Sequence, residues 1–370
     1  MRSSALVTIF AALFLAARAG GAAAQPPPLP RPAPRALPQP EREALHADLL
    51  ADGFVRVRGL LPAGEALAWG ARVAAASAAQ TAACPFASTA GAPGCAGFRG
   101  ESFTRGRALE AADAALLQLS HSPHLARAAA QVLNVSRVRL YQATSFIKPP
   151  GAAPSAWHQD AAACPLHTDK LVTLWLALAP VPPEAGPLVF AAGSHLPGVP
   201  LPSLRDLPPR QRLGSMAKWT SAQVRNMTGL RVTRPLALAP GDATLHLGWT
   251  LHAAPRNVHA SAHRTALAIT YFADGARVHP ELLEMEEAGA GAGAGAAAGA
   301  GAGEGGAGVA FVGEDGRQLR VNLLQDDAET WGPWLHKKPS ILVPGTPVRD
   351  PILTPLLYDE LYDSTPNIPL

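Results

Sequence analysis

Short apolar runs, separated by turns rich in proline and glycine, dominate the chain from residue 138 to residue 272. Runs of this length, several of them alternating apolar and polar positions, predict β-strands. The predicted strands cover residues 138–147, 171–178, 188–190, 236–239, 243–247 and 264–272. This pattern is typical of a β-sandwich or barrel, because a parallel sheet would need a crossover helix between consecutive strands.

The stretch before these strands carries apolar residues mostly at helical spacing. Helices are predicted over residues 41–50, 64–79, 109–119 and 123–133, with one short strand at 54–58. Asp52 and Gly53 end the first helix, and Ser122 and Pro123 supply an N-cap and a first helical residue for the last one. We expect these helices to pack on one face of the sheet, which gives a mainly β fold with flanking α-helices.

Composition divides the chain into a central domain and low-complexity flanks. The expected parts are a signal peptide, a Pro-rich spacer, the domain, a Gly/Ala-rich linker or loop and a C-terminal segment, over residues 1–24, 25–40, 41–287, 288–308 and 309–370. The two low-complexity parts can bury little surface, so we expect an extended spacer and a flexible linker. Aromatic residues late in the chain indicate that the last segment docks back on the domain.

The first residues predict entry into the secretory pathway. Arg2 precedes an apolar run at 5–17, and small residues lead up to Gln25, as in a cleavable signal peptide. The run is shorter than the roughly 20 residues that a membrane span requires, and no later stretch is apolar enough for one. We expect a secretory or extracellular protein whose mature chain has no stable membrane span; an organelle transit peptide is the alternative.

Charge and cysteine content bear on partners and on the compartment. The net charge is +3 over 370 residues and the basic residues form no run, so nucleic acid is not an expected partner. In an oxidising compartment Cys84 and Cys95 could close a short loop, or either could pair with Cys164. The pairing and the oligomeric state stay open.

Candidate metal ligands follow the predicted strand at 138–147. His158 and Asp160 stand two residues apart in an extended stretch, so both side chains point to one face. His252 is the candidate for a third ligand. Two imidazoles and one carboxylate suit a non-haem Fe(II) centre with open positions, whereas a structural zinc site is closed by four ligands and richer in cysteine. Residues of the same types compete with these on spacing alone: His167, Asp169, His246, His259 and His263.

Several short motifs around these residues resemble the phytanoyl-CoA dioxygenase family of Fe(II)/2-oxoglutarate enzymes. The matching motifs are Lys148-Pro149-Pro150-Gly151, Trp157-His158-Gln159-Asp160, Leu174-Trp175-Leu176-Ala177-Leu178, Glu184-Ala185-Gly186-Pro187-Leu188, Gly193-Ser194-His195 and Gly248-Trp249-Thr250-Leu251-His252. The resemblance runs from about residue 52 to residue 275. It implies a double-stranded β-helix (jelly roll), Fe(II), 2-oxoglutarate as cosubstrate, and ascorbate as a candidate additional cofactor.

The resemblance also implies a role for individual residues. His158, Asp160 and His252 would bind the metal. Arg264, twelve residues after His252, would anchor the distal carboxylate of 2-oxoglutarate by two parallel hydrogen bonds. Further residues would border the pocket, with plain core or surface positions as the alternative: Trp175, Gln159, Lys148 and Tyr141.

The competing histidines and one long insertion receive other interpretations. His246 would neighbour the pocket, whereas His259 and His263 would face solvent. His167 would lie in a solvated loop. The insertion at 197–233, basic and irregular, would cover the mouth of the pocket as a lid.

The implied activity is hydroxylation of a C–H bond in an unidentified small-molecule or lipid substrate, with conversion of 2-oxoglutarate to succinate and carbon dioxide. The presence of Asp160 disfavours a halogenase, because halogenases of this family lack the carboxylate ligand. A zinc hydrolase is disfavoured because no paired general base is evident. The remaining alternative is a catalytically inactive jelly-roll module that binds a ligand or partner in the secretory pathway.

Overall fold

The computed structural model describes residues 37–83, 104–107, 113, 115–164, 166–199, 221–278, 308–312, 318–322 and 356–359. The predicted signal peptide, Cys84 and Cys95 lie outside these residues, as do most of the Pro-rich spacer and most of the Gly/Ala-rich linker. The predicted domain is described over most of its length.

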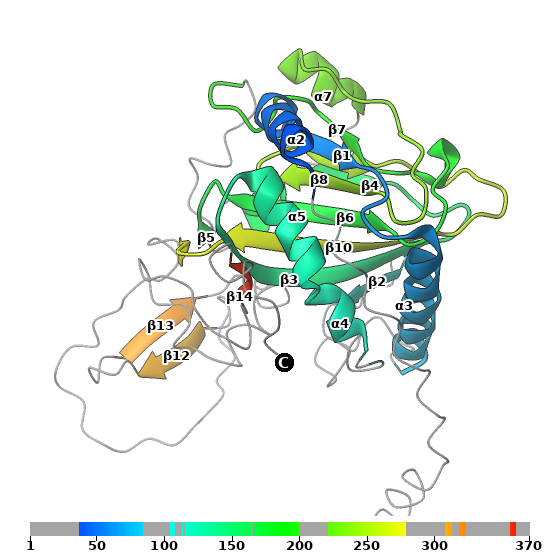
Figure 1. Ribbon diagram of the computed structural model, residues 1–370, viewed down its shortest axis with the longest axis horizontal. Coiled ribbons are helices and arrows are strands. Elements are labelled where there is room, and N and C mark those ends of the chain that lie inside the picture. Colours follow the sequence, from blue (N-terminus) through cyan, green and yellow to red (C-terminus); the bar gives the residue numbers. More distant parts are fainter. Residues whose placement is uncertain are drawn as a thin grey trace, which may run out of the picture. The chain divides into compact units, whose positions relative to one another are not determined.

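A seven-stranded antiparallel sheet forms the larger layer of the domain (Figure 1). Its strands in order of pairing are β1 (Phe54–Val57), β8 (Ala243–Leu247), β6 (Leu171–Ala177), β10 (Arg264–Ala273), β3 (Arg137–Lys148) and β14 (Leu356–Asp359), with β2 (Thr104–Arg107) also paired to β3. The strands predicted at 54–58, 138–147, 171–178, 243–247 and 264–272 are confirmed. The one predicted at 236–239 is wrong: Leu238 makes only an isolated bridge with Val181. Pro235 and Pro240 flank this run and remove backbone donors that a ladder would need.

Three short strands form a second antiparallel sheet, β4 (Ser155–His158), β9 (His252–Ala254) and β7 (Val189–Phe190). β9 is the middle strand and pairs with both of the others, so segments far apart in the sequence lie side by side. The two antiparallel sheets are the layers of a jelly roll, and the predicted fold class is confirmed.

Two smaller strand pairs lie outside these sheets. β5 (Leu166–His167) pairs with β11 (Arg277–Val278). β12 (Gly308–Val312) pairs with β13 (Gln318–Asn322).

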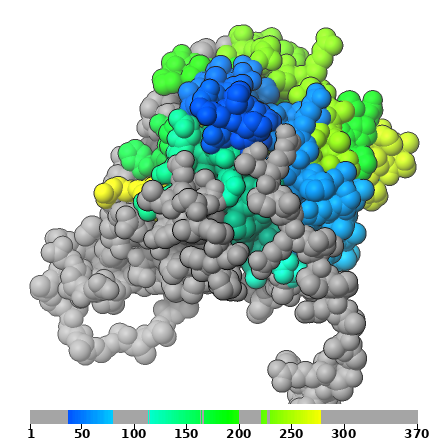
Figure 2. Space-filling model, in the orientation of Figure 1, coloured from blue at the N-terminus to red at the C-terminus, as the bar shows by residue number. Residues whose placement is uncertain are grey.

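Four helices precede β3 in the described part of the chain. They are α2 (Gln39–Asp52), α3 (Ala63–Ala83), α4 (Leu116–Ser120) and α5 (Pro123–Leu133). α5 begins as predicted, with the Ser122 hydroxyl accepting a hydrogen bond from the Leu125 amide. It packs on β3, β6 and β10, and α2 packs on α5 (Figure 1). α2 lies at the surface, where its residues appear deep blue (Figure 2).

The central strands are buried on both faces, and this burial explains their continuous apolar sequence. Every residue of β6 is buried, as is every residue of β10 except the last. Helix α5 packs on these strands. The opposite face of these strands carries side chains of the candidate site.

We had expected the insertion at 197–233 to be irregular, but part of it is helical. Its described part contains helix α7 (Ser221–Thr228), and the side chain of Val224 is fully buried against Trp157 and Leu251. A role as a lid stays a prediction. Among the helices in the described part of the chain, none has the length and apolar character needed to cross a bilayer.

Candidate metal centre

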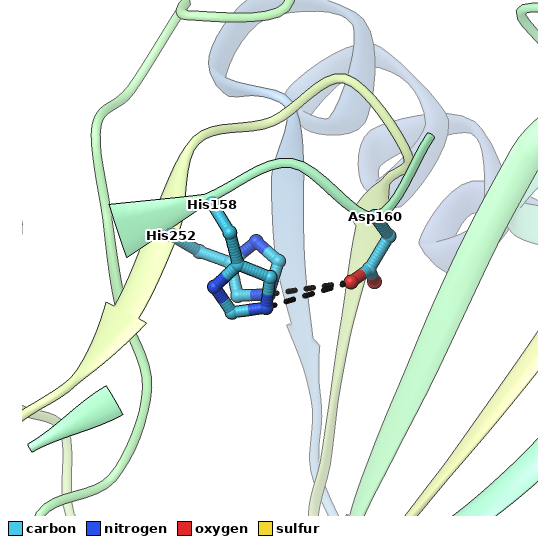
Figure 3. Close-up of side chains that lie close together, drawn as sticks. All are labelled: His158, Asp160 and His252. Atoms are coloured by element: carbon cyan, nitrogen blue, oxygen red, sulfur yellow. Dashed lines mark ion pairs between the residues drawn. The ribbon is translucent and has the colours of Figure 1, made fainter. Parts of the chain in front are cut away.

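Three potential metal donors converge where β4 ends beside β9. His158, the last residue of β4, is the register partner of His252, the first residue of β9. Oδ1 of Asp160 lies 3.7 Å from Nε2 of His158 and 3.8 Å from Nε2 of His252 (Figure 3). One donor atom of each residue lies within 4.8 Å of the other two, a spacing that a single metal ion can bridge.

The backbone at Asp160 differs from the fully extended stretch that we expected. Gln159 is extended, with φ −123° and ψ 124°, but Asp160 begins the 3₁₀-helix η2 (Asp160–Ala163). The side-chain amide of Gln159 donates a hydrogen bond to the Trp249 carbonyl at 2.6 Å. Gln159 therefore ties the ligand-bearing turn to the β8–β9 connection, and its predicted contact with the cosubstrate stays a prediction.

Both histidines present the same ring nitrogen to the centre. Nδ1 of His158 lies 2.8 Å from the Ala156 carbonyl, and Nδ1 of His252 lies 3.0 Å from the Thr250 carbonyl. A carbonyl only accepts, so Nδ1 donates in each ring, and Nε2 is the nitrogen that faces Asp160. Backbone carbonyls commonly fix metal-binding histidines in this way.

Burial and neighbouring charges favour the forms of these residues that bind a cation. Burial and the charge of His246 lower the pKa of His252 to about 4, against smaller opposing effects of Asp160 and Thr250. Burial raises the pKa of the Asp160 carboxyl, but the charge of His252 and a hydrogen bond from His246 outweigh it, so this pKa lies well below its usual range. At neutral pH the site offers a neutral imidazole at His252 and a carboxylate at Asp160, as metal binding requires.

Arg264 is a buried cation without a carboxylate partner among the described residues. Its side chain is 1% exposed, its Nη1 donates to the Gly186 carbonyl at 2.5 Å, and its Nε has no hydrogen-bond partner in the described part of the protein. Its Cζ lies 5.4 Å from the ring centroid of Trp175. Burial lowers the pKa of Arg264 to about 10, so the guanidinium stays protonated at neutral pH. A buried charge with an unused donor suits an anionic ligand.

The register of β10 fixes which residues share a face with Arg264. Ala266 and Ala268 follow at alternate positions, and Trp175 on β6 is the partner of Ala268. Trp175 is also buried beside both alanines in one apolar cluster. The small alanine side chains and the indole therefore line the same face as the guanidinium.

Lys148 and Tyr141 on β3 occupy different kinds of position. Lys148 is the register partner of Arg264, is fully buried, and donates from Nζ to the Pro255 carbonyl at 2.7 Å. It thereby holds the chain that follows β9. Tyr141 lies at the irregularity of the β3–β10 ladder and has no register partner on β10. Contacts of either residue with a cosubstrate stay predictions.

The competing residues lie outside the cluster of donors. His167 and His263 are exposed. We had expected His259 to face solvent. It is instead half-buried, and its Nδ1 accepts hydrogen bonds from the amides of Ser261 and Ala262. It shapes the loop before β10.

Two polar side chains that contact Asp160 extend the site on the larger sheet. His246 had been expected beside the pocket, and its Nε2 lies 3.1 Å from Oδ2 of Asp160. Thr173, which sequence reasoning missed, donates from its hydroxyl to the same oxygen at 2.6 Å. Thr173 lies in an otherwise apolar run, and its polarity in a buried strand was the only signal in the sequence.

A jelly roll with two histidines and one aspartate at the meeting of β4 and β9 defines the protein as a candidate mononuclear metalloprotein of the non-haem type. The sequence model of the phytanoyl-CoA dioxygenase family matches residues 49–266, which is more than half of the chain. The chain belongs to this family, and its membership places it among the oxidoreductases.

Solved structures with a similar fold include enzymes that act on small molecules. The non-haem alpha ketoglutarate dependent carbocyclase SnoK from nogalamycin biosynthesis is 18% identical, with a TM-score of 0.50 and coverage of 65% of this chain and 87% of its own. The epimerase SnoN, solved with Fe3+, alpha ketoglutarate and nogalamycin RO, is 24% identical, with a TM-score of 0.49 and coverage of 71% and 96%. EctD from S. alaskensis is 18% identical, with a TM-score of 0.48 and coverage of 68% and 84%. At this identity SnoK shows the fold alone. No curated protein sequence matches the chain significantly.

Proposed function

We propose that the protein is an Fe(II)- and 2-oxoglutarate-dependent dioxygenase that hydroxylates a C–H bond of a small molecule. The observation that carries the proposal is the group of His158, Asp160 and His252, whose donor atoms all lie within 4.8 Å of one another. Two imidazoles and one carboxylate suit ferrous iron and leave positions for other ligands. Family membership supports the same chemistry.

Different residues of the chain would bind the metal and the cosubstrate. His158, His252 and Asp160 would hold the metal through Nε2, Nε2 and Oδ1. Arg264 would bind the distal carboxylate of 2-oxoglutarate, which would supply the negative charge and the acceptor that its buried guanidinium lacks. When bound, iron and 2-oxoglutarate supply the oxidising power, with succinate and carbon dioxide as by-products.

The pocket residues would position the cosubstrate and keep water out. Trp175 packs beside Arg264, and Ala266 and Ala268 leave space on the same face. The entrance would lie on the side of His158 and Asp160, because their side chains are 34% and 25% exposed, against 5% for His252. A substrate would therefore approach from this side.

The proposal is tested by measuring succinate formed from 2-oxoglutarate, with and without added Fe(II), in the presence of a metabolite extract. We expect iron-dependent turnover in the unaltered protein. His252→Ala should abolish it together with metal binding, whereas His167→Ala should retain both, because His167 is exposed on β5. Equal loss in the two variants would contradict the choice of ligands. Absence of both iron binding and turnover would favour an inactive binding module.

A secretory location is part of the proposal and is supported by the apolar run at 5–17 behind Arg2. Residues 1–24 fused to a reporter should direct it into the medium or the secretory organelles. A reporter that enters another organelle would favour the alternative, a transit peptide.

A further inference from the structure

We infer that His246 and Thr173 are positioning residues that hold one oxygen of Asp160 away from the metal, so that Asp160 binds through Oδ1 alone. This inference rests on the proposed function, since it assumes that Asp160 is a metal ligand. It assigns a purpose to two buried polar side chains of the larger sheet that would not themselves touch the iron.

The two oxygens of Asp160 face different groups. Oδ1 lies 3.7 Å and 3.8 Å from the Nε2 atoms of His158 and His252, at a spacing that suits a shared ion. Oδ2 instead accepts the Thr173 hydroxyl at 2.6 Å and lies 3.1 Å from Nε2 of His246. A carboxylate can bind a cation through one oxygen or through both. Here the second oxygen is already occupied by two donors.

The direction of the hydrogen bonds follows from the groups present. Thr173 has one hydroxyl proton and gives it to Asp160, so Thr270, whose oxygen lies 3.0 Å away, donates to Thr173. On His246, Nε2 must carry the proton to face a carboxylate oxygen. Its Nδ1 has no hydrogen-bond partner in the described part of the chain, so no acceptor is present there for a second ring proton.

The donors stand on rigid, adjacent strands. His246 on β8 is the register partner of Thr173 on β6, and Thr173 is the partner of Thr270 on β10. All three residues are buried, at 1%, 3% and 4% exposure. Groups fixed by sheet register hold a ligand more accurately than groups on loops. The carboxylate on the short turn of η2 thus takes its orientation from the sheet.

His246 is also confined by aromatic packing. Its ring centroid lies 5.5 Å from that of Phe190, which stacks on Phe54 at 4.3 Å. Phe54 is the register partner of His246 on β1. The imidazole has little freedom to turn toward the metal, and it is not among the three donors that lie within 4.8 Å of one another. It is therefore a support of the site and not a fourth ligand.

The test measures the affinity for Co(II) alone, by titration of its visible absorption, without 2-oxoglutarate or substrate. His246→Leu and Thr173→Val remove the donors, whereas His246→Gln and Thr173→Ser keep an N–H or O–H at the same place. We expect Co(II) binding about 10- to 100-fold weaker in the first pair, as found for supports of metal ligands. The second pair should bind within a few-fold of the unaltered protein. The Co(II) spectrum of His246→Leu should also change, because Oδ2 becomes available.

The outcomes separate this inference from the proposed function. Unchanged Co(II) affinity and spectrum in His246→Leu would overturn the inference and leave the function standing. His246→Leu and His246→Gln could also lose Co(II) affinity equally, with an equal fall in the free energy of unfolding of both metal-free variants in urea. His246 would then have only a packing role, and the inference would be overturned. Absence of Co(II) binding by the unaltered protein would overturn both. Tight Co(II) binding without any turnover of 2-oxoglutarate would overturn the function alone.

Discussion

Arg264 is the proposed anchor of 2-oxoglutarate. Its guanidinium is buried, has an unused Nε donor and lies over Trp175. We expect Arg264→Lys to weaken 2-oxoglutarate binding by about tenfold to a hundredfold, because an ammonium cannot form two parallel hydrogen bonds with a carboxylate. Calorimetric titration of 2-oxoglutarate into Co(II)-loaded protein measures this. Co(II) affinity should be unchanged in the same variant, and an unchanged 2-oxoglutarate affinity would remove Arg264 from the cosubstrate site.

Asp242 gives the fold a dependence on pH that is separate from the site. Its carboxylate accepts hydrogen bonds from the Arg56 side chain at 2.5 Å and from the Gly59 and Ala239 amides at 2.9 Å and 3.1 Å. Burial raises the pKa of Asp242, but the hydrogen bond from Arg56 and those from the amides outweigh it, so the folded pKa lies below its usual value. The contribution to stability is therefore present above the unfolded pKa of about 4 and is lost as the pH falls through the folded pKa.

The variant Asp242→Asn tests the contribution of the Asp242 carboxylate to stability. At pH 7 we expect its free energy of unfolding to fall by about 2 kcal/mol, because a charge-assisted interaction is lost and Arg56 keeps its charge. Urea unfolding at pH 7 and pH 3 measures the free energy of unfolding of the variant and of the unaltered protein. The difference between the two proteins should be smaller at pH 3. A difference that is the same at both pH values would contradict this account.

At the scale of elements, helix α3 offers two glycines that should respond in opposite ways to the same change. A Cβ on Gly70 would lie 2.3 Å from the Leu178 carbonyl oxygen, a backbone atom that cannot move aside easily, whereas a Cβ on Gly64 would meet nothing within 4 Å. Alanine favours a helix by about 1 kcal/mol over glycine. We expect Gly64→Ala to raise the free energy of unfolding by about 0.5 kcal/mol, since it lies near the helix start. We expect Gly70→Ala to lower it by about 2 kcal/mol, because overpacking outweighs the helix preference.

Urea unfolding of the two variants side by side is the measurement. Stabilisation by both substitutions would mean that α3 does not approach Leu178 as closely as the structure has it.

Elements with a strong local signal could be predicted from the sequence, and elements fixed by distant pairing could not. The N-cap at Ser122 and the long apolar run of β10 identified their elements closely. By contrast, β4 has four residues, too few for a period, and it forms because it pairs with β9. The turn at η2 and helix α7 carry no apolar pattern that would separate them from loops.

The site divides in the same way. His158 and Asp160 are close in the sequence, so their convergence could be expected, and the family resemblance supplied His252. The partners of Oδ2 could not be predicted, because the register that sets Thr173 beside His246 depends on the pairing of β6 with β8. The position of Lys148, which donates to the chain after β9, also depends on tertiary contacts.

At the scale of the whole molecule, the candidate site takes its residues from both sheets of the jelly roll. His158 and His252 belong to the smaller sheet, whereas Arg264 begins β10 in the larger one. A metal held by the first pair and a cosubstrate held by Arg264 would therefore connect both layers. Any ligand that binds the folded state alone stabilises it, by about 2.7 kcal/mol at a concentration one hundred times its dissociation constant.

We expect Fe(II), added without oxygen, to raise the thermal midpoint of the unaltered protein, and 2-oxoglutarate to raise it further only when the metal is present. The order follows from the two proposed anchors, since Arg264 would hold just one end of the cosubstrate and the metal would hold the other. Differential scanning calorimetry measures each addition, with Asp160→Ala expected to lose both increments and His167→Ala to keep them. An equal gain from 2-oxoglutarate without metal would show that the cosubstrate binds through Arg264 alone, and the two sheets would then not be joined through the metal.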